Sequence, residues 1–164
     1  VSPVYVSFMT GMFFEFFKER PDPIGTPFGF SPPIGGNFGF RFPVQNSDII
    51  PFIEYDLFMH LTVFMTKHDD PLLAIGGAMF LLFGVQYQDM QFALSYYLSS
   101  RSDPEVDDPV LGTVSVLGDD GTFMGLGLHT GFAFQDSTVI RIGLIIPLDK
   151  PCTFGLHLHA IFYF

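Results

Sequence analysis

Four of the five histidines are spaced so that they could ligate a metal ion or transfer protons. His157 and His159 are two residues apart near the C-terminal end, and His60 and His129 lie in segments with a similar alternation of apolar and polar residues. Side chains at positions i and i+2 of a β-strand share one face, but zinc needs three or four converging ligands. The single cysteine, Cys152, provides no thiolate cluster, and no carboxylate has a matching spacing. We therefore expect no metal and no cofactor, and we interpret these histidines as hydrogen-bonding residues of an enclosed polar interior.

Glu54 and Asp56 form a second pair at i and i+2. Two carboxylates that flank a substrate can act as general acid and general base. Buried carboxylates, however, are tolerated only when they are paired with countercharges. Within the predicted strands the remaining charges reduce to Arg41 and Arg141, which fall on the same, more polar face. We expect these four residues to form an internal ion-pair network and predict no catalytic residue among them.

A hydrolase or acyltransferase would need a nucleophile and a base at the ends of neighbouring strands. His68 follows one predicted strand, and a second predicted strand ends in a cluster of Ser99, Ser100, Ser102 and Asp103. If both strand ends lay on one side, a Ser–His–Asp arrangement could assemble there. Serine and aspartate are also the ordinary residues of turns, and this is the interpretation that we favour.

The elements that position these residues follow a period of two. In the last twelve residues one parity carries apolar side chains, and the other is mostly small or polar: Phe154, Leu156, Leu158, Ala160, Phe162 and Phe164 against Thr153, Gly155, His157, His159, Ile161 and Tyr163. Such alternation predicts β-strands with two different faces. Acidic residues beside Gly, Pro or Ser interrupt the pattern as turns. The predicted strands lie near 38–46, 52–67, 72–88, 90–101, 109–117, 121–135, 138–148 and 152–164.

Two segments precede these eight strands. Residues 1–20 are apolar, and Val4 to Phe17 is expected to be either an amphipathic interfacial helix or an extra strand. Residues 21–36 are rich in Pro and Gly and are predicted to be a connector without regular structure. At 164 residues the chain has room for one domain, with the barrel strands in 37–164.

Composition decides which face of these strands is inside. The chain has 22 Phe, only 15 % charged residues, a formal net charge of −10 and a mean hydropathy of +0.39. The absence of a basic patch excludes nucleic-acid binding. The exterior of a soluble barrel carries about a quarter charged residues, whereas the polar parity here is mainly Gly, His, Thr, Ser, Gln and Ala. We therefore predict an all-β chain, a membrane-embedded antiparallel up-and-down barrel of about eight strands whose apolar face contacts the lipid bilayer.

Two local resemblances accompany this pattern. The apolar residues at every second position from Phe154 to the terminal Phe164 resemble the C-terminal strand of small bacterial outer-membrane β-barrels, which in that family is the strand that the assembly machinery reads. The run Phe123-Met-Gly-Leu-Gly-Leu-His-Thr-Gly resembles a strand of the lipid A palmitoyltransferases, which are eight-stranded barrels preceded by an amphipathic helix. The first resemblance implies a location in the bacterial outer membrane, and the second implies lipid-modifying activity as an alternative function.

An eight-stranded barrel has an interior just wide enough for side chains or one small ligand. We therefore expect a non-enzymatic barrel with a lumen filled by side chains, acting as a structural or accessory subunit of an outer-membrane assembly. Its expected partners are the lipid bilayer and other outer-membrane proteins. The alternative is an enzyme that modifies lipids in the outer leaflet.

Overall fold

A computed structural model describes residues 3–19, 24–67, 71–117, 121–134, 137–148 and 152–164. Within these residues the strands are β1 (Val4–Phe17), β2 (Phe28–Ser31), β3 (Pro33–Arg41), β4 (Ile49–Met65), β5 (Leu72–Tyr87), β6 (Met90–Arg101), β7 (Glu105–Asp108), β8 (Gly112–Ser115), β9 (Thr122–Phe134), β10 (Thr138–Pro147) and β11 (Cys152–Tyr163). A search of these residues finds no helix with the length and apolar character needed to span a membrane.

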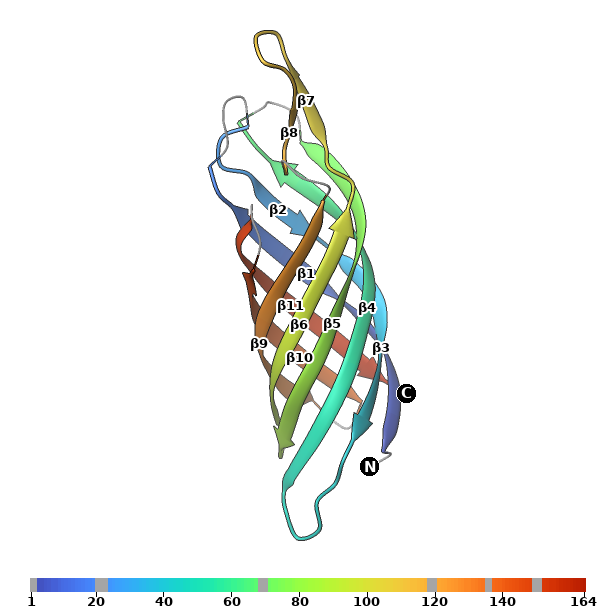
Figure 1. Cartoon of the computed structure of the whole chain (residues 1–164). Coiled ribbons are helices and arrows are strands. Elements are labelled where there is room, and N and C mark those ends of the chain that lie inside the picture. The colour runs from blue at the N-terminus through green and yellow to red at the C-terminus, as the bar shows by residue number, and fades with distance from the viewer. Residues whose placement is uncertain (1–2, 20–23, 68–70, 118–120, 135–136, 149–151) are drawn as a thin grey trace.

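One antiparallel sheet curves round and closes on itself (Figure 1). β1, β4, β5, β6, β9, β10 and β11 occupy seven positions in it. β2 and β3 share the eighth position, because both pair with β1 on one side and with β4 on the other. The barrel is closed by pairing of β1 with β11, from Ser7 opposite Tyr163 to Phe17 opposite Cys152. The prediction of a closed antiparallel barrel of about eight strands is confirmed.

Two segments differ from the prediction in whether they form a strand of the barrel wall. The apolar segment Val4–Phe17, left open as helix or strand, is the strand β1. The predicted barrel strand 109–117 is wrong: this region belongs to a separate two-stranded hairpin, β7–β8, that pairs with no barrel strand. The apolar alternation there reflects packing of the base of the hairpin against the barrel mouth. The two changes compensate, so that the count of eight is preserved.

The Pro/Gly-rich connector 21–36 also contains regular structure, contrary to prediction. β2 and the start of β3 lie within it, and only Pro32 separates them. Proline lacks the N–H that a strand donates to its neighbour, which explains a break of a single residue. Gly35 is required within β3, because a Cβ there would collide with the backbone carbonyl of Leu57 on β4. Residues 21–23 of this segment lie outside the described residues.

The two ends of the barrel differ. Both chain termini lie towards one end, hereafter the terminal end, together with the tight β5–β6 turn at 88–89 (Figure 1). The β7–β8 hairpin projects from the opposite end, hereafter the hairpin end (Figure 1). Small outer-membrane barrels likewise have short turns on the periplasmic side and longer loops on the other. Because β1 is a strand and 109–117 is not part of the barrel wall, the long 102–121 connection falls at the end away from the termini.

The faces of the strands follow the alternation in the sequence. On β4 the side chains of Glu54 and Asp56 are each 1 % exposed, whereas Leu57 and Met59 are 59 % and 69 % exposed. The outer wall is thus mainly apolar, as contact with hydrocarbon requires. The charged side chains of β4 and the lumen histidines are directed inward.

Candidate functional site

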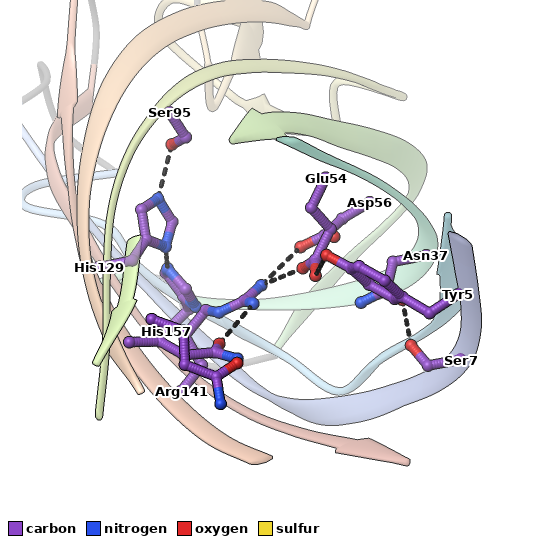
Figure 2. A network of polar contacts seen from close by, with 11 residues as sticks. Tyr5, Ser7, Asn37, Glu54, Asp56, Ser95, His129, Arg141 and His157 are labelled. Carbon is purple, nitrogen blue, oxygen red and sulfur yellow. Dashed lines mark hydrogen bonds and ion pairs between the residues drawn. The ribbon is translucent and has the colours of Figure 1, made fainter. Parts of the chain in front are cut away.

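The lumen contains a buried ion-pair cluster centred on Arg141 of β10. Its Nη1 donates to Glu54 Oε1 at 2.5 Å and to Asp56 Oδ2 at 3.3 Å, both on β4 (Figure 2). Its Nη2 donates to Gln91 Oε1 of β6 at 3.2 Å. The hydroxyl of Tyr5 on β1 donates to the other oxygen of Glu54, Oε2, at 2.7 Å. The cluster therefore joins four strands across the lumen.

Arg41 occupies a different position from the one expected. Its guanidinium lies over the rings of Tyr5 and Tyr163, 4.4 and 4.9 Å from their centroids. These cation–π contacts place Arg41 towards the terminal end of the lumen. Among the described residues, the ion pairs of Glu54 and Asp56 are made with Arg141. Arg41 is connected to that cluster through Tyr5, which contacts both.

A chain of hydrogen-bonding distances runs through the histidines. Ser95 Oγ of β6 lies 2.5 Å from Nε2 of His129 on β9, and Nδ1 of His129 lies 3.0 Å from Nε2 of His157 on β11 (Figure 2). All three side chains are buried. Glycines make room for the imidazoles, since a Cβ at Gly127 or Gly143 would occupy the space of His129 or His157, respectively. The arrangement has a hydroxyl and two imidazoles in line, but it is enclosed within the barrel.

Aromatic rings fill the space around these histidines. Phe80 of β5 lies with its ring centroid 5.1 Å from that of His157 and 5.3 Å from that of His129. His159, fully buried, packs 4.4 Å from His157 between ring centroids. Phe13 of β1 lies 6.2 Å from His157. This aromatic–imidazole layer occupies the middle of the lumen.

A second ion pair, between Glu15 of β1 and Arg101 of β6, lies nearer the hairpin end and was not predicted. Both guanidinium Nη atoms donate to the two carboxylate oxygens, and Nη1 is also 3.4 Å from Thr62 Oγ1. His60, the fourth predicted lumen histidine, is buried with its Nδ1 2.9 Å from the same hydroxyl. Arg101 lies an even number of residues after Gln91 and therefore on the same inward face of β6. The alternation along β6 could thus have predicted that Arg101 is a lumen residue. Glu15 was concealed because its segment had no clear alternation.

The hairpin end of the lumen is covered by an apolar cluster. It combines inward residues from the ends of the barrel strands, Ile24 between β1 and β2, and the base of the hairpin: Phe17, Ile24, Phe64, Ala74, Val106, Val116, Leu117 and Phe123. Asp103 fixes the base, because its carboxylate accepts hydrogen bonds from Ser115 Oγ and, at 2.9 Å, from the backbone N–H of Leu117. The hairpin is therefore packed over the barrel mouth.

The residues considered for nucleophilic catalysis are not brought together within the described part of the chain. Ser99 is buried in the lumen, Ser100 is exposed on the outer wall, and Ser102 Oγ accepts a hydrogen bond from the backbone N–H of Ile75 at 3.0 Å. His68 lies outside the described residues. Among residues 3–19, 24–67, 71–117, 121–134, 137–148 and 152–164, no group of three or more His, Cys, Asp or Glu side chains could hold a metal ion.

Comparison with known proteins identifies the fold. No protein-family model matches the chain, and no curated protein matches it significantly in sequence. The structure of Ail, the attachment invasion locus protein of Yersinia pestis, superposes with a TM-score of 0.50 at 14 % identity, covering 99 % of this chain and 100 % of that one. Also similar are the N-terminal barrel of Pseudomonas aeruginosa OprF (TM-score 0.47, 13 % identity, 97 % of each chain) and Neisserial surface protein A (0.43, 19 %, 99 % and 96 %).

The class of protein is thereby defined. The chain has the fold of a small bacterial outer-membrane β-barrel. The resemblance to lipid A palmitoyltransferases is not shown by these comparisons.

Proposed function

We propose that the chain is an integral outer-membrane barrel whose lumen is closed by its own side chains, and that it serves as a structural or accessory subunit. The observation that carries this proposal is the succession of layers along the lumen. Arg41 with its two tyrosines is followed by the Arg141 cluster, the aromatic–imidazole layer, the Glu15–Arg101 pair and the apolar cluster under the hairpin. A pore would need a continuous polar passage through these layers.

The width of the barrel interior and the volume of the cavity within it support a closed lumen. Eight strands leave an interior that side chains alone can fill. A cavity bordered by Phe13, Glu15 and Tyr97 has a volume of about 10 Å³, which is about the space of one water molecule.

The β7–β8 hairpin supports an accessory role. One carboxylate oxygen of Asp108 accepts hydrogen bonds from the backbone N–H groups of Val110 and Leu111, each at 2.8 Å. These bonds order a tip whose side chains are exposed, 87 % for Val110 and 59 % for Leu111. An ordered apolar tip that projects from the barrel is suited to contact with another outer-membrane protein, because little conformational entropy is lost on binding.

Reconstitution in planar bilayers tests the closed lumen. The purified barrel should give no stepwise current, and a variant in which Phe13, Phe58 and Phe80 are all changed to Ala should conduct if it remains folded. Stepwise conductance of the unmodified barrel would contradict the proposal. Incubation with labelled phospholipid and lipid A tests the enzyme alternative: product formation that Ser95→Ala or His129→Ala abolishes would replace our proposal with it.

A further inference from the structure

A groove of about 750 Å³ crosses the outer wall of the barrel over β5, β6, β9, β10 and β11. One side of it is a row of outward side chains in continuous strand register: Phe83, Leu94, Leu128, Leu144 and Leu156. Neighbouring strands are about 4.8 Å apart, so a row of five strands extends over about 19 Å. The volume is within the range of small-molecule sites, about 300–1,000 Å³.

The floor of the groove is the backbone of residues whose parity faces the lumen. Gly84, Ala93, His129 and Gly143 lie between the two rows of outward side chains, and Cβ atoms at either glycine would point into the lumen. The second row is Val85, Phe92, Thr130 and Ile142. Thr130 is the one outward residue of the lining with a polar side chain. The groove can therefore accept a hydrocarbon chain, but it offers no site for a polar group along its length.

The direction of the groove matches the orientation of a membrane lipid. On β5 its residues, Phe83 and Val85, lie next to the β5–β6 turn at the terminal end. On β10 and β11 its residues, Leu144 and Leu156, lie in the middle of the strands, about half-way up the wall. The groove thus runs from the level of a turn to the centre of the wall. In a bilayer leaflet, a lipid has its polar headgroup at the level of the turn, and its acyl chain extends to the centre of the wall.

We propose that this groove binds the acyl chain of a phospholipid from the leaflet at the terminal end, with the headgroup beside the Gln88–Asp89 turn. The turn also determines which headgroup is preferred. Asp89 is exposed and is the one charged residue between positions 71 and 100. An exposed carboxylate attracts a headgroup amine and repels an anionic head. Phosphatidylethanolamine should therefore bind more tightly than phosphatidylglycerol with the same acyl chains.

Native mass spectrometry of the full chain, titrated with each of these two lipids, tests the inference, which rests on the barrel being membrane-embedded. Thr130→Trp and Leu128→Trp place a large side chain in the groove, and either variant suffices if the other does not fold. Leu57→Trp, on the outer face of β4 away from the groove, is the matched control. The unmodified chain and the control should bind one phosphatidylethanolamine with equal affinity, and the groove variants at least ten-fold more weakly. Asp89→Asn should remove the preference between the lipids.

Several results would overturn this site. Equal lipid binding by all variants would show that the lipid lies elsewhere. A dimer of the chain that Thr130→Trp dissociates would show that the groove is a protein interface. A barrel that is folded, judged by a mobility shift between boiled and unboiled samples, yet binds neither lipid would refute the inference alone, since the closed lumen is tested separately by conductance.

Discussion

Replacing Arg141 with methionine should destabilise the barrel more than replacing the whole ion-pair cluster. Arg141 makes two charge-assisted hydrogen bonds to carboxylates, each worth about 1.5–3 kcal/mol, which gives a loss of about 3–6 kcal/mol. Breaking a buried ion pair by removing one partner costs a similar amount, about 3–5 kcal/mol. The reason is that Glu54 and Asp56, each 1 % exposed, cannot reach water to recover their hydration.

The comparison is a triple variant in which Arg141→Met is combined with Asp56→Leu and Glu54→Gln. The glutamine keeps an acceptor for the Tyr5 hydroxyl, which is therefore not left without a partner. Urea unfolding in lipid vesicles, followed by circular dichroism and by gel mobility of unboiled samples, measures both losses. The triple variant should recover at least about 2 kcal/mol of the loss seen for Arg141→Met. A triple variant no more stable than the single one would refute the reasoning that an uncompensated buried charge dominates.

Four further changes have defined outcomes in the same unfolding assay. Arg101→Met should cost about 3–5 kcal/mol, because it leaves the buried Glu15 without its countercharge; a loss below 1 kcal/mol would contradict the pairing. Gly143→Ala should cost about 1–3 kcal/mol through collision with the imidazole behind it. Gly77→Ala is its control and should change stability by no more than about 1 kcal/mol, since the added Cβ would meet its nearest atom at 3.7 Å. His159→Phe should be neutral or stabilising by about 1 kcal/mol, because both ring nitrogens are buried without a hydrogen bond among the described residues; a large loss would indicate an additional polar partner.

The face of each residue could be predicted from the sequence wherever the two faces differ in polarity. On β4, Glu54 and Asp56 alternate with Tyr55 and Leu57, and their burial follows from that alternation. On β1 the alternation disappears at Phe13, because the lumen there is itself aromatic and both faces are apolar. For this reason helix and strand both remained open for this segment, and Glu15 could not be recognised as a lumen residue.

The level that a lumen side chain occupies along the barrel axis could not be predicted from the alternation of faces. Arg41 has the same face as Asn37, but it lies at the end of β3 and meets tyrosine rings from β1 and β11. Which residues share a level depends on the register between strands, and the register depends on turns and on glycines such as Gly35. Segment 109–117, which contains β8, was mistaken for a wall strand because Val114 and Val116 pack against the barrel mouth. Burial of one face produces the same alternation in a wall strand and in such a hairpin.

The β1–β11 seam has a consequence for how the chain folds. Ser7 pairs with Tyr163, at nearly opposite ends of the sequence, so these contacts have almost the largest sequence separation that the chain allows. Contacts of this kind slow folding, because the entropy of closing a long loop must be overcome before the contacts form. Until β11 arrives, the outer edge of β1 has unpaired backbone N–H and C=O groups, which are a template for pairing with other chains. The slow step, and the stage most exposed to aggregation, should therefore be closure of the seam after the neighbouring hairpins have formed.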